Sequence, residues 1–230
     1  MEQTIYHITL VITGLINLGL GIQMLARLGK YRAFPAYRRA RICCAVWMLS
    51  FTTGYWMHAF LLRGIEWPTL FMALTVTYFH IGTIAFNWGF ISFLKPGYLT
   101  RKRVLVDIAI LLVGLVSYWT AAFVSKEVTL YSVLSVMPFF LYGSYLIIKF
   151  YNAYNQASEH VVQLQEGTMT NFVRWLQMCC DLIIVVGLSS VAITGMLNST
   201  PWLSVVMHWL GAALFTYIAY SMEQFGKTLL

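Results

Sequence analysis

Long apolar runs follow one another through almost the whole chain and restrict its fold more than any other feature of the sequence. A helix needs about 20 apolar residues to cross the roughly 30 Å hydrocarbon core of a bilayer. The chain holds seven such runs, at 4–26, 42–62, 68–94, 104–124, 128–149, 172–196 and 202–222. They predict an all-α, polytopic membrane protein in which residues 1–230 form one integral membrane domain, a bundle of seven transmembrane helices, with no soluble domain.

The composition agrees with this class of protein. Hydrophobic residues make up 60% of the chain, charged residues only 10%, and the mean hydropathy is +0.72. A soluble domain has charged side chains at about a quarter of its positions. The connections expected on the outer side, at 63–67, 125–127 and 198–202, are too short for a ligand-binding domain. A signal from outside must therefore enter between the helices or through the lipid.

Lys and Arg are concentrated in alternate connections. If the N-terminus lies outside, thirteen of the fifteen fall on the inner side, and only Arg63 and Lys126 lie outside. Inner loops of membrane proteins are enriched in Lys and Arg, so we expect the N-terminus outside and the C-terminus in the cytoplasm. Because this charge abuts the bilayer, we expect no direct nucleic-acid binding. The residues assigned to topology and to anionic headgroups are Arg38, Arg39, Arg41, Arg101, Lys102 and Arg103.

Five polar side chains within the apolar runs are candidates for a ligand or switch site, because polar groups are costly to bury in a membrane and often functional. They are His58, His80, His208, Asp181 and Asn87. Asp181 is the best single candidate for a functional charge. Its rival Asp107 is expected to lie close enough to the inner surface to stay hydrated.

The histidines allow three interpretations. They could hold a metal or haem, form a ligand or protonation site, or make structural hydrogen bonds between helices. The sequence assigns no metal ligand and no catalytic residue, and no cofactor is expected. A small membrane enzyme or a haem or metal protein using His58, His80 and His208 is the alternative to a non-enzymatic role, and a transporter subunit is a second alternative.

Three segments resemble the membrane region of Bacteroides-type transmembrane regulators, in which about seven helices precede a cytoplasmic AraC-type helix-turn-helix or a histidine-kinase module. One is a Tyr-x-x-Ala-Arg entry to the second run, another a Leu-x-Pro-x-x-Leu-Thr-x-x-Arg exit from the third, and the last a Tyr-Asn…Arg-Trp-Leu segment before the sixth. The matching residues are Tyr37, Ala40, Arg41, Leu94, Pro96, Leu99, Thr100, Arg103, Tyr151, Asn152, Arg174, Trp175 and Leu176. The resemblance supplies no site residues.

The resemblance implies a sensor that relays a signal to a cytoplasmic effector from the inner membrane of a bacterium. The chain ends after "SMEQFGKTLL", where those regulators would continue into an effector. We therefore expect the partner to be a separate effector protein or a missing C-terminal domain, besides the lipid bilayer, with a homodimer as a further option. The polar segment 151–171 is expected to extend the fifth helix as a partner surface or to serve as a plain connector.

Overall fold

The computed structural model describes residues 2–62, 65–95, 97–164, 178, 181, 185 and 201–229, and these residues form helices and connections without a strand. The main helices are α1 (Glu2–Leu25), α2 (Pro35–Trp56), α3 (Pro68–Leu94), α4 (Arg101–Val124), α5 (Leu130–Leu164) and α7 (Pro201–Thr228). Two short elements flank α2: the 3₁₀ turn η1 (Leu28–Tyr31) and the π-helical turn η2 (Met57–Leu61). Apart from its three isolated residues, the run expected at 172–196 lies outside the described residues.

Five of these helices are long and apolar enough to cross a membrane: Gln3–Leu25, Pro68–Leu94, Arg101–Val124, Leu130–Ala157 and Trp202–Thr228. The prediction of an all-α, multi-pass membrane protein is therefore confirmed at this level. The helix α2 is not among the five, and it carries three arginines close to its start.

Helix boundaries differ from the apolar runs mainly where charged residues join a helix. The bounds of α3 coincide with the run at 68–94. In contrast, α2 begins at Pro35 rather than at residue 42, because proline suits the first turn of a helix, where no backbone N–H is needed. Helix α5 continues beyond 149 to Leu164, which matches the expected extension of the fifth helix.

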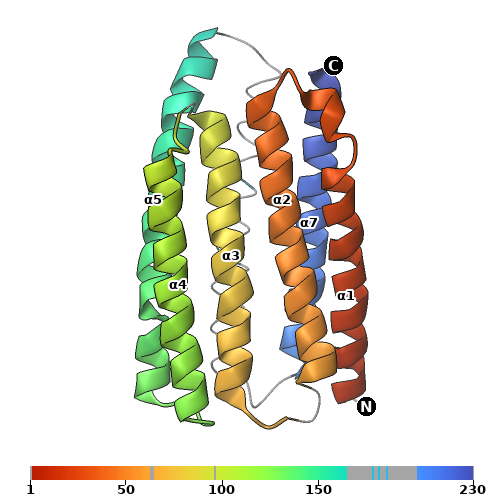
Figure 1. Cartoon of the computed structure of the whole chain (residues 1–230). Helices are drawn as coiled ribbons and strands as arrows, with labels where there is room; N and C mark the ends of the chain where they lie inside the picture. Colours follow the sequence, from red (N-terminus) through yellow and green to blue (C-terminus); the bar gives the residue numbers. More distant parts are fainter. Residues whose placement is uncertain are drawn as a thin grey trace.

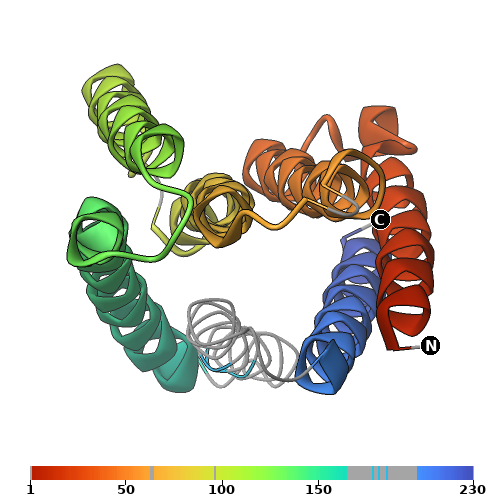
Figure 2. The same ribbon diagram turned by 90° about the horizontal axis from the view of Figure 1, so that it is seen from below.

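Successive helices from α1 to α5 run in alternating directions, and α7 lies beside α1 (Figures 1 and 2). One end of the bundle therefore holds the C-termini of α1, α3, α5 and α7 and the N-termini of α2 and α4. We call it the basic end. Twelve of the thirteen described Lys and Arg residues lie there, and Lys126 lies at the opposite end. Lys and Arg thus gather at one end of the fold itself, as the loop pattern predicts.

Helix α3 is the central element of the bundle. It contacts α2, α4 and α5. Within its apolar membrane-spanning stretch 67% of the residues are buried, against 22% in the corresponding stretch of α4. This explains why α3 is apolar around its whole circumference. Figure 2 shows α4 on the outside of the group, where its exposed apolar side chains are suited to lipid.

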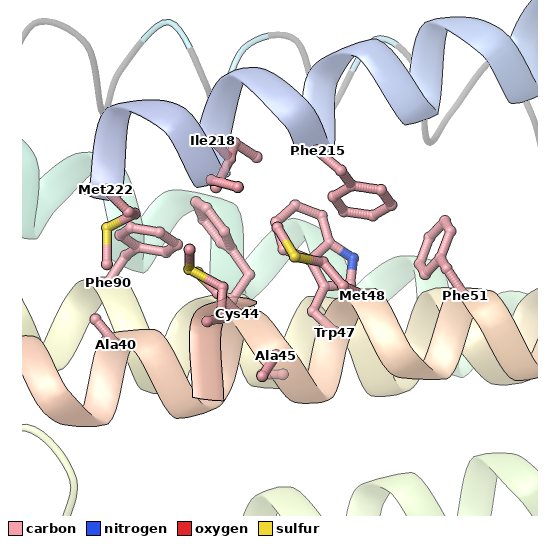
Figure 3. Close-up of a cluster of buried hydrophobic side chains, with 14 of the residues drawn as sticks. Ala40, Cys44, Ala45, Trp47, Met48, Phe51, Phe90, Phe215, Ile218 and Met222 are labelled. Atoms are coloured by element: carbon pink, nitrogen blue, oxygen red, sulfur yellow. The ribbon is translucent and has the colours of Figure 1, made fainter. Parts of the chain in front are cut away.

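Helices α2 and α3 approach closely because glycine leaves room for an aromatic ring. The ring of Tyr78 in α3 lies over Gly54 of α2, and Trp47 of α2 lies over Gly82 of α3, so that each helix fills a notch in the other. Small residues are a common means of close helix packing in membranes. The same face of α2 also meets α7, where the rings of Trp47 and Phe51 lie 4.7 and 5.1 Å from that of Phe215 (Figure 3).

We predict that Gly54→Ala destabilises the bundle, because the added methyl group overlaps the buried ring of Tyr78. Overpacking of this kind costs about 1–3 kcal/mol. The control is Gly143→Ala, where a Cβ meets nothing within 4 Å. Thermal unfolding in detergent should show a lower midpoint for Gly54→Ala only; equal midpoints would show that the notch is not tightly filled.

Candidate functional site

A cluster of aromatic rings and two histidines connects α1, α2, α3 and α7 at the end opposite the basic end. His58 lies in the π-helical turn that follows α2 and is 3% exposed. Its Nε2 lies 3.2 Å from the Thr75 hydroxyl oxygen of α3, and its ring stacks on Phe71 at 5.3 Å. Such π-helical turns are often found at functional sites. The Nδ1 of His58 has no hydrogen-bond partner within the described part of the chain.

His208 of α7 faces the same cluster. Its ring centroid lies 4.6 Å from that of Tyr55 in α2 and 5.8 Å from that of Tyr6 in α1. Its Nδ1 lies 2.5 Å from the Ser204 carbonyl oxygen, and only an Nδ1–H can donate to a carbonyl, so this contact selects the Nδ1-protonated tautomer. We call Tyr6, Tyr55, His58, Tyr78 and His208 the histidine cluster.

At the basic end a single buried arginine connects the other ends of α1, α2 and α7. Arg41 of α2 is 1% exposed. Its Nε donates to the carbonyl of Met24 at 3.0 Å, and its Nη2 donates to those of Gln23 and Ala26 at 2.9 and 3.2 Å. Carbonyls at a helix C-terminus lack intrahelical partners and carry partial negative charge, so a guanidinium there is favourable.

The same arginine also holds α7. Arg41 Nη1 forms an ion pair with Glu223 Oε2 at 2.6 Å. Beside it, the hydroxyl of Tyr37 donates to the Met222 carbonyl at 2.5 Å and accepts from Arg41 Nη1 at 3.3 Å. The guanidinium carbon lies 5.1 Å from the ring centre of Tyr31 in η1. We call Arg41, Tyr37, Glu223 and the carbonyls of Gln23, Met24 and Ala26 the arginine clamp.

The clamp corrects one sequence prediction. Arg41 was expected, together with Arg38 and Arg39, to mark topology and contact headgroups, but its guanidinium is buried and committed to α1 and α7. Arg38 is exposed and Arg39 half-buried. At the start of α4, Arg101 and Lys102 are exposed, whereas Arg103 is half-buried and forms an ion pair at 3.0 Å between its Nε and Asp107 Oδ1.

Asp107 is also not hydrated, contrary to expectation. Its side chain is 1% exposed and accepts hydrogen bonds from Trp88 Nε1 at 2.6 Å and from the Tyr142 hydroxyl. A buried carboxylate needs such partners to offset the loss of water.

Tyr98, in the α3–α4 connection, packs against Arg103: its ring centre lies 5.5 Å from the guanidinium carbon of Arg103. Burial raises the pKa of the Tyr98 phenol.

His80 is separated from the other two histidines. It follows Tyr78 by two residues, about 200° around α3, and therefore faces α4 and α5 instead of α2. Its ring lies against Gly114 and 5.3 Å from that of Phe139. Neither ring nitrogen has a hydrogen-bond partner among the described residues. Within that part of the chain no three His, Cys, Asp or Glu side chains are placed to hold a metal.

The two remaining candidates join neither cluster. Asn87 is buried in α3 and donates to the Thr83 carbonyl one turn earlier at 2.8 Å. Asp181 is exposed and accepts a hydrogen bond from Tyr151 of α5. The structure thus brings together His58 and His208 of the five predicted residues. Sequence reasoning assigned Tyr37 only to the family resemblance and did not predict Tyr37, Tyr55 or Glu223 as site residues, although Glu223 is an acidic residue directly after an apolar run, which is a usable signal.

Comparisons of the chain with protein-family models, with curated proteins and with solved structures find no match. The resemblance to the membrane region of Bacteroides-type regulators therefore stays a prediction.

We predict that Arg41→Met strongly destabilises the bundle, because it leaves Glu223 unpaired and the three carbonyls at and just after the end of α1 without their donor. Removing one partner of a fully buried ion pair costs about 3–5 kcal/mol, and because the Glu223 side chain is 24% exposed and can be hydrated, we expect a loss below that range for the pair itself. The matched control is Arg38→Met, which removes an exposed arginine one turn earlier in the same helix. Unfolding in detergent should separate the two variants clearly. Equal stability of both would mean that the clamp contributes nothing to the folded state.

Proposed function

We propose that the chain is a seven-helix membrane protein, with its N-terminus outside and its C-terminus in the cytoplasm, that senses a signal and relays it to a cytoplasmic effector. The observation that carries the proposal is that α2 and α7 are joined at both ends of the bundle by two chemically different contacts. Tyr55 meets His208 at one end, and Arg41 meets Glu223 at the other.

The two contacts are suited to different tasks. The clamp is an ion pair supplemented by several hydrogen bonds, which fixes the geometry of the basic end. The histidine cluster consists of rings in edge contact and has an unused ring nitrogen on His58. Edge contacts between rings contribute only about 0.5–1.5 kcal/mol beyond burial. A ligand or a change of protonation at that end therefore competes with weak interactions.

Helix α7 is the element that would carry the signal. His208 and Glu223 are fifteen residues apart, which is about 22 Å along a helix. A ligand that binds one arrangement of His208 and Tyr55 better than another would bias the position of α7. Shifts of about 1–2 Å between packed helices are a common form of such a change, and Glu223 would transmit the shift to the clamp.

Helix α5 supplies the surface for an effector. Contacts between Ser117 and Ser135 and between Arg103 and Tyr145 set its register against α4 and place Lys149 beside the first turn of α4. The fifteen residues from 150 to 164 then extend about 22 Å past that level. Exposed polar side chains occur on this extension, among them Asn152, Gln156 and Glu159. We propose that it contacts the effector in the cytoplasm of a bacterium.

The enzyme alternative has less support. It needs His58, His80 and His208 near one another, and His80 lies on the opposite face of α3, against α4.

The orientation can be measured by cysteine labelling. In a chain without its native cysteines, Lys126→Cys should react with a membrane-impermeant maleimide in intact cells. Lys30→Cys, which is also exposed but lies at the basic end, should react only after permeabilisation. The reverse pattern would place the basic end outside and contradict the proposed orientation.

The relay is tested by hydrogen exchange along α7. We expect His208→Ala to raise amide exchange in residues 221–229 by about fivefold, equivalent to roughly 1 kcal/mol of local opening free energy. The control is Trp209→Ala, which truncates a larger but 44% exposed side chain of the same turn. A rise confined to residues near 208, with no change at 221–229, would mean that the two ends are not coupled and would refute the relay.

A further inference from the structure

Two cations from different helices converge on one aromatic ring at the basic end. Arg103 of α4 donates from Nη1 to the Tyr145 hydroxyl at 3.0 Å, and its guanidinium carbon lies 5.2 Å from the ring centre. Lys149, one turn further along α5, places its Nζ 5.5 Å from the centre of the same ring. Like charges that converge in this way favour an anion between or beside them.

The charges in this region are only partly balanced. Asp107 forms an ion pair with Arg103, but its carboxylate is buried and also accepts hydrogen bonds from Trp88 and Tyr142. Lys149 is exposed and forms no ion pair with any described residue. The local positive charge is therefore not neutralised within the part of the chain that the structure describes.

Tyr145 is suited to donate to an anion. In the hydrogen bond between Arg103 and Tyr145 the hydroxyl oxygen of Tyr145 is the acceptor, so the hydroxyl proton of Tyr145 is free to point toward another acceptor. The residue is 40% exposed. A hydroxyl that accepts from a guanidinium becomes a stronger donor, because hydrogen bonds in a chain polarise one another. The hydroxyl of Tyr145 and the ammonium group of Lys149 together offer a phosphate oxygen a hydrogen bond and a charge.

We infer that Tyr145 and Lys149, with Arg103 as the positioning residue, bind the phosphate headgroup of an anionic phospholipid. The position fits, because the register between α4 and α5 places Lys149 beside the start of α4, where the membrane-spanning part of α4 begins. Tyrosine and lysine side chains are common at that level of a bilayer.

The neighbouring surface favours a lipid over free phosphate. On α5, Leu141 is one turn before Tyr145 on the same face and is 67% exposed, and Ile148 is 59% exposed. On α4, Leu105 and Leu112 are exposed as well. An acyl chain attached to the bound phosphate can cover these side chains, whereas inorganic phosphate leaves them in contact with other lipids. This inference does not depend on the proposed signalling role.

The test is native mass spectrometry of the full chain in detergent with equal amounts of phosphatidylglycerol and phosphatidylcholine. The unmodified chain should retain phosphatidylglycerol preferentially. Lys149→Gln should lower this preference by about fivefold, the effect of one cation near a membrane surface. Tyr145→Phe, which keeps the ring and removes the donor, should lower it too. Both changes are at exposed positions, and gel filtration and helicity verify folding.

Lys227→Gln is the matched control, because it removes an exposed lysine from the same end of the bundle. It should leave the preference unchanged. Equal retention of the two lipids by the unmodified chain would overturn the inference, and so would an equal loss in Lys227→Gln. Displacement of the lipid by excess inorganic phosphate would show that the phosphate alone is recognised, which would overturn the assignment to a lipid.

Discussion

The interaction on which the rest of the bundle depends is that of the Arg41 guanidinium with groups from three helices. A buried cation is tolerated only if nearly all its donors are used, and the groups that use them come from the end of α1 and from Glu223 in α7. About 180 residues separate Arg41 from Glu223 in sequence, so this contact joins the C-terminal helix to the first helix pair. The turn between α1 and α2 has to bring the α1 carbonyls to the arginine, and Arg27 adopts a left-handed conformation there, with φ of 59°.

A second buried charge organises the other half of the molecule. Asp107 of α4 is satisfied by Trp88 of α3 and Tyr142 of α5. Both buried charges thus lie toward the basic end, whereas the opposite end of α2 and α7 is held by rings and by histidines that form weak contacts. Strong polar interactions resist displacement and weak ring contacts allow it, so the two ends of the bundle differ in how easily they change.

The sequence predicted the features that depend on local pattern. The extent of α3 and the concentration of Lys and Arg at one end follow from hydropathy and charge alone. The burial of Arg41 and Asp107 could not be predicted, because their partners Glu223, Met24 and Tyr142 come from other helices and depend on packing order. The separation of His80 from His58 follows partly from helical period. His58 lies against Tyr78 of α3, and His80, two residues further along α3, must face the opposite way from Tyr78. Which neighbouring helix each one faces is fixed only by the three-dimensional arrangement.

The contacts between α2 and α7 also determine how a displacement would pass along the bundle. Between the two ends, Phe215 of α7 is held by Trp47 and Phe51 of α2 (Figure 3). His208 precedes it by seven residues and Glu223 follows it by eight, so the two arms measure about 10 and 12 Å. Helix α7 also packs along α1; if α7 pivots about Phe215, a shift of His208 toward Tyr55 moves Glu223 in the opposite direction by a similar amount. Because the ion pair of Glu223 with Arg41 is short, even a small movement of that kind would change it.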